Sequence, residues 1–95
     1  MNEFFERLGR RWTKAAERRG VKIEEPKLDP KVAEELLELA RVVAHTSERR
    51  FAPLASYTAG VAVERLRAVK GATAADTASY IREVREALES EVRPG

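Results

Sequence analysis

The stretch that decides the fold is DPKVAEELLELARVVAH, residues 29–45. Asp29 followed by Pro30 signals a helix start. The Asp side chain can accept a bond from a free backbone N–H, and proline at the first helical position lacks the donor that would go unpaired. Apolar residues then recur at three- and four-residue intervals, at Val32, Leu36, Leu37, Leu39, Ala40, Val43 and Ala44. This pattern predicts an amphipathic helix over residues 30–45, with a broad apolar face that contacts more than one neighbour.

Similar patterns predict three further helices, over residues 2–19, 52–69 and 74–91. The first has an apolar stripe that contains Phe4, Phe5, Leu8 and Trp12, and Gly20 stands at its C-terminal cap. We expect the residues between it and Pro30 to form a loop.

The third predicted helix has Pro53 in its first turn and Gly71 at its end. Apolar and small residues surround its middle, which predicts a central helix with a tight crossing at Gly60. Thr73 and Asp76 resemble a capping box at the start of the last helix. No run alternates with period two outside the loop, so the sequence predicts an all-α, four-helix bundle-like single domain over residues 1–95.

The composition narrows the class of protein. The 95 residues contain no cysteine, which excludes a disulfide framework and thiolate chemistry. Arginines interrupt the apolar residues near the start, and no apolar run is long enough for a membrane span, so we expect a cytoplasmic protein. Arg exceeds Lys, Glu exceeds Asp and Gln is absent, which favours a thermophilic source.

Motifs for catalysis and metal binding are missing from the sequence. It has one histidine, no glycine-rich phosphate loop and no nucleophile elbow, so we expect neither a cofactor nor a metal site. Glu34, Glu35 and Glu38 form an acidic group, which we interpret as a solvated face opposite the leucines. Trp12 and Tyr57 both lie on apolar stripes, and we expect them in the core.

The best candidate for a ligand- or partner-binding site consists of Arg41, His45, Arg49 and Arg50. Arg41 and His45 are four residues apart and project from one helix face. The other two precede a helix N-terminus, where free N–H groups and a partial positive charge favour anions. In the alternative interpretation His45 caps the helix that ends there, and Arg41 and Arg49 pair with Glu48 or with carboxylates of the last helix.

The same stretch resembles a small bacterial domain family of unknown function, frequent in actinobacteria. The resemblance rests on Leu39-Ala40-Arg41, Val43-Ala44-His45, Arg49, Ala52-Pro53-Leu54, Tyr57 and Gly60. Some members of that family are fused to, or encoded beside, the molybdenum cofactor guanylyltransferase. The resemblance implies that context for this chain, with the guanylyltransferase as a candidate partner.

Three classes of function follow. The leading hypothesis is a non-catalytic accessory module that binds a partner protein or an anionic small molecule. A DNA-binding domain is the alternative, because Arg10, Arg11, Lys14, Arg18 and Arg19 make the first helix basic; missing base-reading residues argue against a nucleic-acid partner. A small enzyme that uses His45 as general acid or base is the third. We also expect a homodimer, with Phe51 at its interface.

Overall fold

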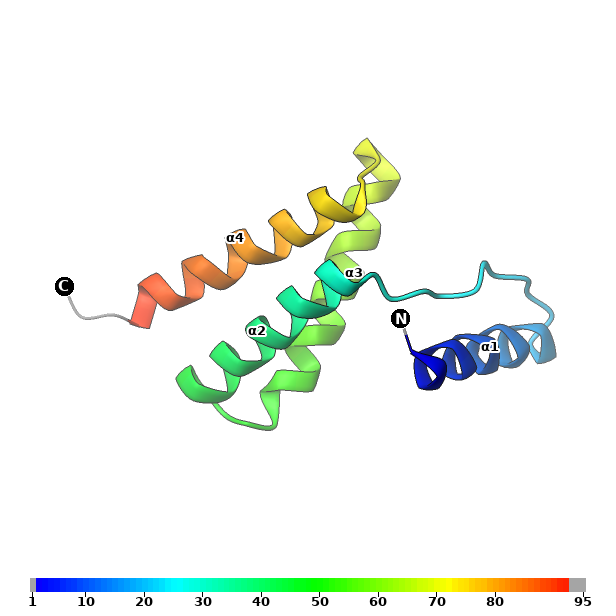
Figure 1. Ribbon diagram of the computed structural model, residues 1–95, viewed down its shortest axis with the longest axis horizontal. Helices are drawn as coiled ribbons and strands as arrows, with labels where there is room; N and C mark the ends of the chain where they lie inside the picture. The colour runs from blue at the N-terminus through cyan, green and yellow to red at the C-terminus, as the bar shows by residue number, and fades with distance from the viewer. Residues whose placement is uncertain (1, 93–95) are drawn as a thin grey trace. The chain divides into compact units, whose positions relative to one another are not determined.

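The computed structural model describes residues 2–92 and contains four helices (Figure 1). They are α1 (Glu3–Arg18), α2 (Pro30–Thr46), α3 (Phe51–Lys70) and α4 (Ala74–Val92). No strand occurs among these residues. The all-α prediction is therefore confirmed, with helix bounds within two residues of those expected. The chain divides into two compact units, Met1–Pro30 and Lys31–Gly95. That all four helices form one bundle stays a prediction.

Helix α1 of the first unit is capped at both ends by local hydrogen bonds. Asn2 Oδ1 accepts a bond from the N–H of Phe5 at 3.2 Å. At the other end Gly20 has φ of 77°, its N–H donates to Glu17 O at 2.9 Å, and the N–H of Val21 donates to Ala16 O at 3.0 Å. These two bonds define a Schellman motif, which confirms Gly20 as the stop signal.

The segment after α1 returns to that helix at Gly9. Gly9 is the buried residue of α1, and a Cβ added to it would lie 2.7 Å from the carbonyl oxygen of Pro26 and 3.2 Å from Cγ of Glu25. A glycine here permits the close approach of two backbones. Trp12 is 57% exposed, so the first unit by itself does not bury it, and a core position for it stays a prediction. One helix with an extended segment has too little surface to enclose an indole ring.

The second unit has a small core to which α2, α3 and α4 each contribute. Leu39, Val63 and Ile81 are its buried centre, and half-buried residues of the same three helices surround them. Helix α4 starts with the predicted capping box, in which Thr73 N–H donates to Asp76 Oδ2 and Asp76 N–H donates to Thr73 Oγ1, both at 3.1 Å. Helix α2 begins at Pro30 as predicted, but Oδ2 of Asp29 is buried without a hydrogen-bond partner.

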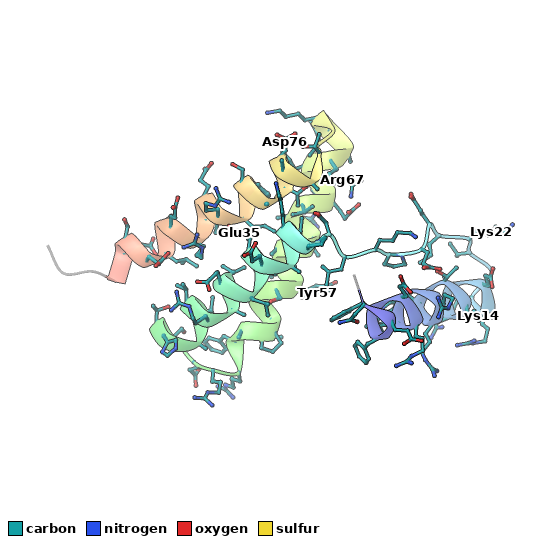
Figure 2. All side chains as sticks on the ribbon, in the orientation of Figure 1. Lys14, Lys22, Glu35, Tyr57, Arg67 and Asp76 are labelled. Atoms are coloured by element: carbon teal, nitrogen blue, oxygen red, sulfur yellow. The ribbon has the colours of Figure 1, made fainter. Side chains whose placement is uncertain are left out.

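A network of ion pairs joins α2 to α4. Oε2 of Glu35, which is labelled in Figure 2, accepts a bond from Nε of Arg82 at 2.9 Å, and its Oε1 accepts one from Nε of Arg85 at 3.4 Å. Arg85 also donates to Glu89 at 2.6 Å. The side chains of Glu35 and Arg85 are only 12% and 16% exposed. The prediction that Glu35 belongs to a solvated face is therefore wrong, because α4 covers it.

These contacts also set the charge of Arg85. Burial acts to lower the pKa of Arg85, but the hydrogen bond to Glu89 and the charges of Glu35 and Glu89 outweigh it and raise the pKa. The guanidinium therefore stays charged, and its role in this fold is to hold α2 and α4 together.

Candidate binding surface

Two of the predicted site residues lie on one exposed face of α2. Arg41 donates from Nε and Nη2 to Oε2 of Glu38, at 3.1 and 2.9 Å. Both side chains are about half exposed, so water competes for this pair. His45 follows one turn later in the last turn of the helix and is exposed. The alternative in which Arg41 pairs with Glu48 or with α4 is wrong, because Glu38 is a nearer partner on the same helix face.

The other two predicted residues lie in the turn between α2 and α3, and both are exposed. Nη2 of Arg50 is 3.4 Å from Oε2 of Glu48, and its guanidinium lies 5.6 Å from the centre of the Phe51 ring. This cation–π contact covers part of Phe51, which is half-buried. Three arginines and one histidine thus lie along the end of α2 and the following turn, and all four side chains are exposed to solvent.

The backbone at the start of α3 does not add free donors to this group. The N–H of Phe51 donates to Glu48 O at 2.9 Å, and the N–H of Ala52 donates to Arg49 O at 3.1 Å. Pro53, the next residue, has no N–H. The helix N-terminus therefore lacks the unpaired N–H groups on which a small-anion site depends.

An apolar stripe begins after Arg50 and follows α3 on the side that faces away from the core of the second unit. We call this side, with Leu54, Tyr57, Val61 and Ala68, the outer face of α3. Leu54 and Tyr57 are 62% and 73% exposed. Tyr57, which is labelled in Figure 2, lines a shallow hollow with residues that follow it along α3. The hollow is lined by Ser56, Tyr57, Gly60, Val61, Glu64, Arg65 and Ala68. The second unit by itself therefore does not bury Tyr57, and a core position for it stays a prediction.

Val63 and Ala59, and not Tyr57, are residues of α3 that face the core. Ala59 packs against the buried cluster of the second unit, and it lies about half a helical turn from Tyr57. Gly60 is exposed, and a Cβ added there would meet no atom within 4 Å. The predicted tight crossing at Gly60 is thus wrong for this unit, whose core lies on the opposite side of the helix.

Sequence reasoning missed the outer face of α3, although a signal existed. Leu54, Tyr57, Val61 and Ala68 follow one another at helical spacing. Because apolar residues also occur on the opposite side, the pattern alone does not tell which side is inside. The sequence identified the Arg and His residues and the apolar stripe that contains Tyr57, but it assigned that stripe to the core and not to the surface beside the arginines.

The fold places the chain among small all-α proteins, and a match to a family model identifies the family to which it belongs. Residues 6–94 match DUF6457, a domain of unknown function, and the chain belongs to this family. Neither the curated proteins nor the solved structures gave a match. Over residues 2–92, none of the four helices is long and apolar enough to cross a membrane. The described residues also contain no group of three His, Cys, Asp or Glu side chains placed to hold a metal ion.

Proposed function

We propose that this chain is a non-catalytic accessory module that binds a partner protein through the outer face of α3 and the adjoining basic turn. The observation that carries the proposal is the exposure of Leu54 and Tyr57 on the same helix face as Arg50. Two large apolar side chains next to each other on an exposed face are typical of an interface. Tyr and Arg are also the residue types that contribute most to binding energy at protein interfaces.

The charges around this face favour an acidic partner. Arg49 and Arg50 precede the stripe, while Arg65, Arg67 and Lys70 follow it at the other end of α3. Nearby acidic residues offset only part of this charge: Glu48 lies 3.4 Å from Arg50, and Glu64 lies 3.3 Å from Arg67. The complementary ligand is an amphipathic helix with a central apolar stripe and Asp or Glu toward its ends.

The proposal also gives a reason for Gly60. Glycine in the middle of a helix costs about 1 kcal/mol relative to alanine, and no neighbour in its own unit uses the space. On an exposed face, a missing Cβ allows the backbone of a partner helix to approach closely. We therefore place the closest approach of the partner at Gly60, between Tyr57 and Glu64.

An open basic surface suits a protein better than a small anion. Arg41, His45, Arg49 and Arg50 are all exposed, and the first N–H groups of α3 are already paired. A small anion binds most tightly where several hydrogen-bond donors converge on it in a site that is shielded from water. We propose that these four side chains instead steer and position an acidic protein surface.

The partner to test first is the molybdenum cofactor guanylyltransferase, which the resemblance of residues 39–60 implies. Co-purification should recover it with the wild-type chain and with Leu37→Glu, but not with Tyr57→Glu. Leu37 is the matched control, because it is a 71% exposed apolar residue of α2 in the same unit. No co-purification with the wild type would remove the pathway proposal. Equal recovery with Tyr57→Glu would instead show that another surface is used.

The sequence also predicts a homodimer with Phe51 at its interface, and the outer face of α3 is a second candidate for that interface. Light scattering at micromolar concentration separates a monomer near 10.7 kDa from a dimer of twice that mass. A dimer that Tyr57→Glu dissociates would place α3 at the two-fold axis, and one that only Phe51→Glu dissociates would support the interface predicted from the sequence.

A further inference from the structure

A cavity of about 270 Å³ that is partly open to solvent lies between α2, α3 and α4 of the second unit, and two of the residues that line it, Thr58 and Val84, are exposed. Leu39 and Ile81, which are 5% and 4% exposed, line it together with Ala59, Tyr80 and Leu88. Small-molecule sites in proteins are concave and lined mainly by apolar side chains, as this one is. A guest in this cavity would gain dispersion contacts that the chain itself does not supply.

The lining defines the chemistry of such a guest. The residues around the cavity include no Asp, Glu, Lys, Arg or His, so a charged group would lose its hydration without gaining a partner. The hydroxyls of Thr58 and Tyr80 are the polar side-chain groups of the lining. The Thr58 hydroxyl donates to Ala55 O at 2.8 Å, so it remains available as an acceptor.

The size of the cavity limits the guest as well. Apolar cavities of about 150 Å³ stay dry and bind benzene, so the larger cavity here has room for two fused rings. We infer that the cavity between α2, α3 and α4 is a binding site for an uncharged, mainly apolar molecule of about the size of a fused two-ring aromatic, with one polar group directed at the Tyr80 or Thr58 hydroxyl. This site is separate from the partner face, because Ala59 and Tyr57 lie on opposite sides of α3.

The test uses the full chain with indole as the probe and benzoate as a charged aromatic of similar size. In a methyl-labelled sample, indole should shift the resonances of Leu39 and Leu88 but not that of the exposed Leu54. It should also raise the melting temperature, whereas benzoate at the same concentration should do neither.

Two alanine variants of α3 complete the design. Ala59→Leu fills part of the cavity and should weaken indole binding roughly tenfold or more, since a single extra methylene in an apolar pocket already has an effect of this size. Ala68→Leu makes the same change on the outer face and should leave indole binding unchanged. The inference is overturned if indole perturbs the Leu54 methyls as strongly as those of Leu39, if benzoate binds equally well, or if Ala59→Leu binds indole like the wild type. The chemical-shift changes of the wild-type methyl groups test the inference even if Ala59→Leu does not fold.

Discussion

Replacing Glu35 by glutamine should destabilise the second unit through the ion pairs that join α2 to α4. Gln and Glu have similar helix propensities, so the change removes the charge and little else. Breaking a fully buried charge pair costs about 3–5 kcal/mol, whereas an exposed pair contributes about 0–1 kcal/mol. Glu35 and Arg85 are close to the buried case, while Arg82 is half exposed. We therefore expect a loss of about 2 kcal/mol in the free energy of unfolding.

Urea and thermal unfolding followed by circular dichroism measure this loss. For a domain of 60–100 residues, about 2 kcal/mol corresponds to a fall of roughly 8–16 °C in the melting temperature. The matched control is Glu34→Gln, because Glu34 is the exposed neighbour on the same helix and such surface changes usually stay within about 0.5 kcal/mol. If the two variants unfold alike, Glu35 does not hold α2 and α4 together and the reasoning is refuted.

Two further predictions concern the contact between Gly9 and the segment after α1, and the capping box at the start of α4. Gly9→Ala should displace the segment at Pro26, because the new Cβ would lie 2.7 Å from the Pro26 carbonyl oxygen; trypsin should then cleave faster after Lys27, and an unchanged cleavage rate would contradict this. The Thr73 backbone N–H, its side chain and the Lys70 charge lower the pKa of Asp76 below its ordinary value of 3.8. Its stabilising effect is therefore present above that value and lost as the pH falls through the lower folded-state pKa. Asp76→Ala should be less stable than the wild type at pH 6, with a difference that disappears toward pH 2; a difference independent of pH would exclude the charge as its cause.

The helix ends could be predicted from the sequence because their causes are local. Gly20 forms the predicted Schellman motif, and Thr73 and Asp76 form the predicted capping box. Pro30 begins α2, and Pro53 lies in the first turn of α3. The two capping motifs depend on hydrogen bonds between residues at most five apart, and each proline lacks the N–H that the first turn of a helix would leave unpaired, so the sequence pattern contains what is needed.

The sides that the helices turn inward were harder to predict, because they depend on distant residues. Glu35 continues the stripe of the buried Leu39 and Val42, and Arg85 continues that of Ile81. Both spacings are visible in the sequence, but a charged residue on a core face is expected only when a partner across the interface is known. For the candidate site, the sequence identified exposed basic residues, but not that Leu54 and Tyr57 adjoin them on the surface.

The most direct test of the proposed function is a calorimetric titration of the guanylyltransferase with the wild-type chain, Tyr57→Ala and Leu37→Ala. If the outer face of α3 is the binding surface, Tyr57 is a dominant contact. Its truncation should then cost about 2 kcal/mol, a weakening of roughly thirtyfold in Kd. Leu37→Ala should bind within about twofold of the wild type, because it removes a similarly exposed side chain from another helix. An unchanged Kd for Tyr57→Ala, or equal losses for both variants, would contradict the assignment of this face.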